Sequence, residues 1–193
     1  MPFDAPPPFA AWQHRDARDG FEVVFIRPDD DGYRIEGDTA ALEDGEVWTV
    51  RYVVNVDRAW VTRSAFVSRQ SASGWQRLVL EADDAGGWLV NGSPAPNLEG
   101  CVDVDLESSA VTNALPVHRL ELEVGRAAAA PAAFVRVLDL HVERLEQRYV
   151  RLEDDASHQR YHYAAPRFGV ECQLTYDEFG LILDYPGIAS RMA

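Results

Sequence analysis

Apolar and polar side chains alternate along most of this chain. The clearest stretch is residues 47–57, where every second residue from Trp48 to Val56 is apolar and Thr49 and Arg51 stand between them. Successive side chains of a β-strand point to opposite faces of a sheet, so this alternation predicts a strand with one buried face.

Other segments with the same period predict further strands. These segments are residues 21–27, 60–69, 76–82, 88–91, 101–106, 117–124, 133–140, 144–152, 160–164, 168–177 and 181–185. Turn-forming pairs such as Asp31-Gly32 and Asp44-Gly45 separate many of them. About a dozen short strands joined by turns are typical of an all-β barrel or sandwich.

Helix is expected in one place only. Residues 108–115 can form one or two helical turns, with Ser108 or Ser109 as the N-cap. Pro116 is expected to stop this helix.

The length and composition favour a single folded unit. The chain has 193 residues, of which 47% are hydrophobic, enough for a domain with a sizeable core. Neither a repeat of fixed period nor a linker divides the sequence. We therefore expect one domain over residues 11–193, preceded by a loose Pro-rich tail at residues 1–10.

The chain is strongly acidic, with a formal net charge of -14. All 18 basic residues are Arg, and they are interspersed with acidic residues. Such a surface repels polyanions, so nucleic acid and anionic membranes are poor partners. The absence of Lys also excludes Schiff-base chemistry.

Targeting and membrane signals are missing from the sequence. The N-terminus lacks the basic and apolar regions of a signal peptide, and no apolar run approaches the ~20 residues of a membrane helix. We expect a cytoplasmic protein without an integral membrane segment, in which Cys101 and Cys172 are reduced thiols.

Motifs of nucleophilic and metal catalysis are also missing. There is no Gly-x-Ser-x-Gly sequence, and the β pattern lacks the strand-turn-helix that this motif needs. On a strand, His158 and His162 would lie ~13 Å apart, too far to bind one metal ion together. We expect no catalytic residue, no metal and no cofactor.

Asp103 and Asp105 are the most informative polar pair. On a strand over residues 101–106 their side chains share one face, about 6.7 Å apart. They could act as the acid and base of a glycosidase, form a polar cluster with Arg119 inside a cavity, or belong to a solvated strand face.

Aromatic residues form a second group. Tyr149, Tyr161 and Tyr163 fall on two neighbouring expected strands. Such residues ordinarily fill a core. Alternatively, Tyr and Trp side chains line a groove and stack on sugar rings or acyl chains.

Taken together, several segments resemble a bacterial family described as putative glycolipid-binding. The matching segments are residues 78–83, 87–92, 98–106, 112–120, 147–149, 161–163 and 180–187. The resemblance implies one strongly curved antiparallel sheet that forms a barrel or half-barrel, similar to the carriers of bacterial lipoproteins. In those carriers short helices plug the mouth of an apolar cavity, and residues 108–115 are the candidate for such a plug.

The leading hypothesis is a non-enzymatic protein that binds a lipid or glycolipid. The polar end of its site is expected at Asn91, Asp103, Asp105, Asn113 and Arg119, with Arg119 as the charge partner of a phosphate or carboxylate. The wall is expected at Trp75, Trp88, Tyr149, Tyr161 and Tyr163. Two alternatives stay open: a small β-barrel hydrolase, isomerase or cyclase that uses Asp103 or Asp105, and an interaction module whose polar cluster is purely structural.

Overall fold

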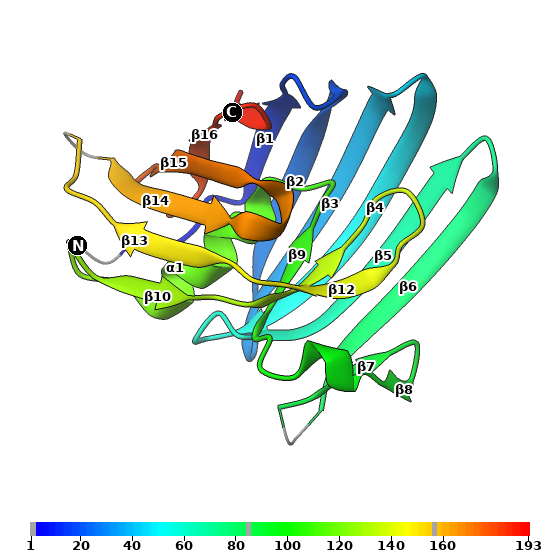
Figure 1. Ribbon diagram of the computed structural model, residues 1–193, viewed down its shortest axis with the longest axis horizontal. Helices are drawn as coiled ribbons and strands as arrows, with labels where there is room; N and C mark the ends of the chain where they lie inside the picture. The colour runs from blue at the N-terminus through cyan, green and yellow to red at the C-terminus, as the bar shows by residue number, and fades with distance from the viewer. Residues whose placement is uncertain (1–2, 84–85, 156–157) are drawn as a thin grey trace.

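The computed structural model of the protein describes residues 3–83, 86–155 and 158–193 (Figure 1). Its main feature is a curved sheet of 14 strands within those ranges, in the order β10-β13-β14-β15-β16-β17-β1-β2-β3-β4-β5-β6-β7-β8. All neighbours in this sheet pair antiparallel, and its end strands β10 and β8 do not pair with each other. The expected curved antiparallel sheet is confirmed, and because the sheet is not closed it agrees with the half-barrel rather than the barrel.

The strands of this large sheet span most of the chain. Their bounds are β1 Phe9–His14, β2 Asp19–Asp29, β3 Gly32–Glu43, β4 Glu46–Asp57, β5 Thr62–Ser71, β6 Gly74–Ala82, β7 Trp88–Val90, β8 Ser93–Pro94, β10 Ala127–Ala129, β13 Arg148–Arg151, β14 Gln159–Ala165, β15 Val170–Tyr176, β16 Ile182–Tyr185 and β17 Ala189–Arg191.

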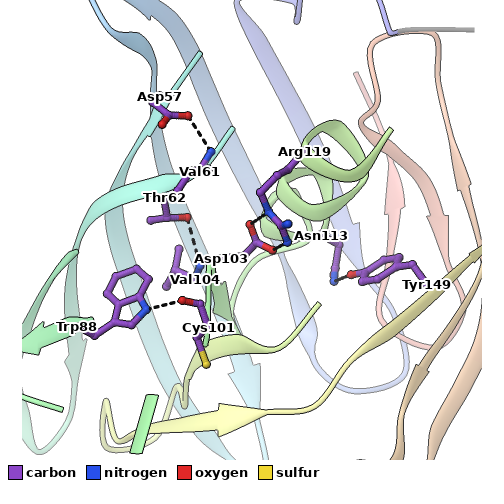
Figure 2. Close-up of polar contacts among 10 residues, drawn as sticks. All are labelled: Asp57, Val61, Thr62, Trp88, Cys101, Asp103, Val104, Asn113, Arg119 and Tyr149. Carbon is purple, nitrogen blue, oxygen red and sulfur yellow. Dashed lines mark hydrogen bonds and ion pairs between the residues drawn. The ribbon is translucent and has the colours of Figure 1, made fainter. Parts of the chain in front are cut away.

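A small second sheet packs against the large one. It contains β9 (Asp103–Leu106), β11 (Ala132–Val135) and β12 (Val142–Leu145), with β9 and β11 parallel. The backbone N–H of Val104 donates to the Thr62 hydroxyl at 3.3 Å, which attaches β9 to β5 (Figure 2). Every residue of β9 and β11 is buried because protein covers both faces of these strands.

A helical segment follows β9 where the sequence predicts the plug, and we keep that name for it. The segment begins and ends later than the expected residues 108–115, and its N-cap is Ala110, not Ser108 or Ser109. The 3-10 helix η2 (Val111–Asn113) leads directly into α1 (Ala114–Leu120). Pro116 lies in the first turn of α1 and does not stop it, because the backbone N–H that proline lacks has no helical partner at that position. The expected strand over residues 117–124 is therefore wrong, since its first half is helical.

Several strand boundaries also differ from the prediction. The alternation predicts one strand over residues 144–152, but the chain leaves the small sheet after β12 and joins the large sheet at β13, with Gln147 at the crossing. The sequence did not predict β3, whose pattern is weakened by small residues. One of these is Gly37, where a Cβ atom would lie 2.0 Å from the Cζ atom of Tyr52. The glycine makes room for this buried phenol ring.

The N-terminal segment is attached to the body of the protein. The backbone N–H of Asp4 donates to the carbonyl oxygen of Glu178 at 2.9 Å. The ring of Phe3 contacts that of His118, and β1 begins at Phe9, inside the segment expected to be a loose tail. No helix in the described ranges has the length and apolarity needed to cross a membrane.

Candidate functional site

A cavity of about 240 Å³ lies between the small sheet and the C-terminal strands of the large sheet. We call it the site cavity. Its lining residues are Ala17, Arg18, Glu43, Asp105, Leu106, Glu107, Ser109, Asn113, Phe134, Leu145, Tyr163, Ala165, Phe168, Val170, Tyr185 and Ile188. Aliphatic and aromatic side chains make up most of its wall. The polar groups come from β9 and the segment that joins it to η2, from η2 itself, from the β1–β2 turn and from the end of β3.

Asp105 places a carboxyl group in the wall of this cavity. Its carboxylate accepts hydrogen bonds from the Thr112 hydroxyl at 3.0 Å and from the Gln147 amide. Burial raises the pKa of Asp105 to about 6, and the negative charges of Asp103 and Glu107 act in the same direction. A carboxyl group with this pKa changes its charge close to neutral pH.

This pKa gives Asp105 a measurable effect on stability. A folded-state pKa above the ordinary 3.8 means that the folded protein keeps a proton that the unfolded chain has lost. The contribution of Asp105 to stability is therefore lost as the pH rises from about 4 to about 6. At 1.36 kcal/mol per pKa unit, the loss is about 3 kcal/mol.

We predict that Asp105→Asn removes this pH dependence. The side-chain amide of Gln147 can flip so that its oxygen accepts a hydrogen bond from the amide group of the new Asn. The hydrogen bonds of the site can therefore be kept. Between pH 4 and pH 7, the unfolding free energy of the variant should gain about 2.5 kcal/mol relative to that of the wild type, which is most of the full effect. Urea unfolding across this range measures the difference. A difference that does not change with pH would contradict the assignment.

Asn113 and a group of buried tyrosines lie near Asp105, and of these tyrosines Tyr163 and Tyr185 line the cavity. The Asn113 amide donates to the Tyr149 hydroxyl at 2.9 Å (Figure 2), and the Tyr176 hydroxyl donates to the Asn113 carbonyl oxygen at 3.2 Å. The rings of Tyr149 and Tyr163 lie 5.1 Å apart, and Tyr163 packs edge-on against Tyr185. Burial raises the pKa of each of these tyrosines, so at neutral pH they are hydrogen-bonding phenols and not bases.

Asp103 and Arg119 form a separate ion pair. The Nε and Nη2 atoms of Arg119 donate to Oδ1 and Oδ2 of Asp103 at 3.0 and 2.5 Å (Figure 2). Asp103 is 2% exposed, and neither residue lines the site cavity. Because Asp103 balances the charge of Arg119, the expected role of Arg119 as charge partner of a ligand would require this pair to break.

The other residues expected at the site lie elsewhere. Asn91 is in the β7–β8 turn, where its side-chain oxygen accepts from the Val79 N–H at 2.9 Å. Trp75 on β6 is 64% exposed. Trp88 is buried and donates its indole N–H to the Cys101 carbonyl oxygen at 2.9 Å (Figure 2).

Three of the ten expected residues line the site cavity itself: Asp105, Asn113 and Tyr163. Tyr149 stands behind Asn113 as its hydrogen-bond partner. Tyr161 lines a different cavity, together with Phe3 and Leu122. The expected pairing of the tyrosine strands is nevertheless confirmed, since Tyr149 lies opposite Tyr163 in the β13–β14 register.

Glu22, which the sequence analysis missed, connects the large sheet to the plug. Its Oε1 atom accepts from the Ser109 hydroxyl at 2.5 Å and from the Tyr52 hydroxyl, and its Oε2 atom accepts from the Ala110 N–H at 2.8 Å. Burial raises the pKa of Glu22. The alternation did not show which face of β2 is buried, because Phe21 and the residues on its face of the strand are also apolar. In the structure Phe21 is 53% exposed and Glu22 is fully buried.

A metal-binding group is not found among the residues that the structure describes. No three or more His, Cys, Asp or Glu side chains there lie close enough to bind a metal ion together. Both cysteines are free thiols. The site cavity offers apolar contact, hydrogen bonding and the titration of Asp105.

Comparisons with known proteins agree with the fold. No curated protein matches the chain. A DUF1089 family protein from Pseudomonas aeruginosa, of known crystal structure, is 32% identical with a TM-score of 0.77, over 89% of this chain and 92% of that one. A β-barrel-like DUF1849 protein from Brucella abortus is 9% identical with a TM-score of 0.52, over 98% of this chain and 95% of that one, and shows likeness of fold alone. The family described as putative glycolipid-binding matches residues 9–191, so the chain belongs to this family.

Proposed function

We propose that this protein binds the apolar part of one lipid or glycolipid molecule in the site cavity, without catalysing a reaction. The observation that carries the proposal is a cavity with largely apolar walls and a few polar groups, which lies between two sheets and opens to solvent. Each Å² of apolar ligand or cavity surface that is removed from water contributes roughly 25 cal/mol to the free energy of binding. The polar groups at Asp105 and Asn113 would fix the orientation of the ligand.

The size of the cavity limits how much of the ligand enters. A volume of about 240 Å³ is below the ~300–1,000 Å³ of typical small-molecule pockets. It equals the volume of roughly eight liquid waters at ~30 Å³ each. One short stretch of hydrocarbon fits inside, and the rest of the molecule stays at the mouth, where Phe168 is 41% exposed.

Acid–base catalysis is a second candidate because one observation favours it. Asp105 lines the cavity with a pKa of about 6, which suits a general acid or base. The expected partnership with Asp103 is not favoured, since both oxygens of Asp103 bind Arg119. An enzyme would lose turnover in Asp105→Asn while its affinity for substrate persists.

The limited size of the cavity can be tested by calorimetry. Alkyl glucosides of increasing chain length are titrated into the protein below their critical micelle concentrations. We expect saturable binding at one molecule per chain. The affinity should rise by up to about fourfold per added CH₂, because each buried CH₂ contributes ~0.8 kcal/mol, and then level off when the cavity is full. An absence of saturable binding, or a rise without a plateau, would contradict the proposal.

Two further expectations from the sequence concern location and partners. A cytoplasmic location and the exclusion of nucleic acid both stay predictions. The acidic composition, with a net charge of -14, supports the second of them.

A further inference from the structure

A charged pair that the proposed function does not use lies on the wall of the site cavity. Arg18 is in the β1–β2 turn, and Glu43 is the last residue of β3. The Arg18 side chain is only 5% exposed, and that of Glu43 is 19% exposed. Side chains of this kind are rarely buried unless their polar atoms are paired.

Arg18 is held in place but keeps one donor free. Its Nη1 atom donates to the Glu107 carbonyl oxygen at 3.1 Å, and its guanidinium lies 5.2 Å from the centre of the Trp48 ring. Its Nη2 atom is 3.5 Å from Oε1 of Glu43, longer than the ~2.7–2.9 Å of a close ion pair. Among the described residues, the buried Nε–H of Arg18 has no hydrogen-bond partner.

Glu43 keeps one acceptor free beside this donor. Its Oε2 atom is buried and has no partner in the part of the chain that the structure describes. The Trp48 indole lies beside Glu43, but no hydrogen bond of normal geometry joins them. Arg18 and Glu43 both line the cavity, and each carries one buried polar atom that has no partner among the described residues: an N–H donor on Arg18 and a carboxylate acceptor on Glu43.

The charges around the cavity disfavour an anionic ligand group. Among the described residues that line the cavity, Arg18 is the one cation, against the carboxyl groups of Glu43, Asp105 and Glu107. Glu43 already balances Arg18, and Glu107 uses one oxygen to accept from the Val137 N–H at 2.6 Å. A phosphate or carboxylate placed here would meet uncompensated negative charge at low dielectric.

We propose that Arg18 and Glu43 form a recognition pair for a hydroxyl group of the ligand, so that the cavity selects uncharged, hydroxylated amphiphiles over anionic ones. A hydroxyl both accepts and donates a hydrogen bond. When the two side chains rotate toward the cavity, the hydroxyl oxygen accepts from the Nε–H of Arg18 and the hydroxyl hydrogen is donated to Oε2 of Glu43. This assignment rests on the proposed function, because it names the head group of the same ligand.

The test compares an alkyl glucoside with an alkyl phosphate of equal chain length on wild type, Arg18→Gln and Glu43→Gln. We expect the wild type to bind the glucoside more tightly. Glu43→Gln keeps the shape and removes a negative charge, so its affinity for the phosphate should rise roughly tenfold relative to the glucoside. Arg18→Gln should weaken glucoside binding by roughly tenfold. Melting curves verify that each variant is folded.

Asp38→Asn is the matched control, since Asp38 is an exposed carboxylate on β3 whose side chain is 58% exposed. Asp38→Asn changes the net charge of the protein as Glu43→Gln does, but it should leave the preference for the glucoside over the phosphate unchanged. Tighter binding of the phosphate by the wild type, or an equal shift in the control, would overturn the recognition pair. Equal affinity for both compounds would overturn it while leaving the proposed function intact. Failure of both compounds to bind would overturn the proposed function itself.

Discussion

Glu22→Ala should lower the free energy of unfolding by about 3–5 kcal/mol. The substitution removes the acceptor of three buried donors, which are the hydroxyls of Tyr52 and Ser109 and the N–H of Ala110. A buried donor that loses its partner costs about 1–3 kcal/mol. Because Tyr52 lies on the large sheet and Ser109 and Ala110 precede η2, the loss also loosens the contact between sheet and plug.

Chemical denaturation of the purified variant measures this effect. Glu171→Ala is a suitable control, because Glu171 is also a strand glutamate with a hydrogen bond, to His162, but its side chain is 71% exposed. It should change stability by less than about 1 kcal/mol. A loss below about 1 kcal/mol for Glu22→Ala would mean that the buried carboxylate does not hold the plug.

The sequence predicted those strands whose two faces differ clearly in polarity. In β4, residues from Trp48 to Val56 alternate between buried apolar and partly solvated positions, as the pattern indicates. In β2 both faces carry apolar residues, so the pattern does not reveal that Glu22 points inward and Phe21 outward. Local periodicity therefore identifies a strand more reliably than the face that it buries.

The sequence predicted only part of the candidate site, because the rest of the site depends on long-range contacts. The strand pattern correctly placed Asp103 and Asp105 on one face, but their surroundings differ. Arg119 on α1 binds Asp103, whereas Asp105 meets Thr112 and Gln147 and lines the site cavity. No local pattern specifies which helix or strand end will reach a given carboxylate.

Arg18 and Glu43 illustrate the same limit. Arg18 lies in the β1–β2 turn and Glu43 at the end of β3, and they meet because β2 and β3 pair as neighbours. In the sequence each is one charged residue in an acidic chain. Their burial on the cavity wall, which makes them informative, becomes visible only in the folded protein.

Filling the site cavity should have the largest effect on binding. Ala165 is the last residue of β14, is 1% exposed and lines the cavity. A Trp side chain at this position would occupy the space available for hydrocarbon, so Ala165→Trp should weaken the binding of an alkyl glucoside by at least about tenfold. Val170→Trp fills the same cavity from the paired position on β15 and serves as a second variant if crowding at Ala165 impairs folding.

Ala164 provides the matched control because it is the preceding residue of the same strand and points to the opposite face of the sheet. The decisive measurement is the calorimetric affinity for octyl glucoside of folded Ala165→Trp, compared with that of Ala164→Trp. A cavity that binds hydrocarbon predicts a loss of at least about tenfold for Ala165→Trp and an affinity near that of the wild type for Ala164→Trp. Equal affinities in the two variants would contradict ligand binding in this cavity.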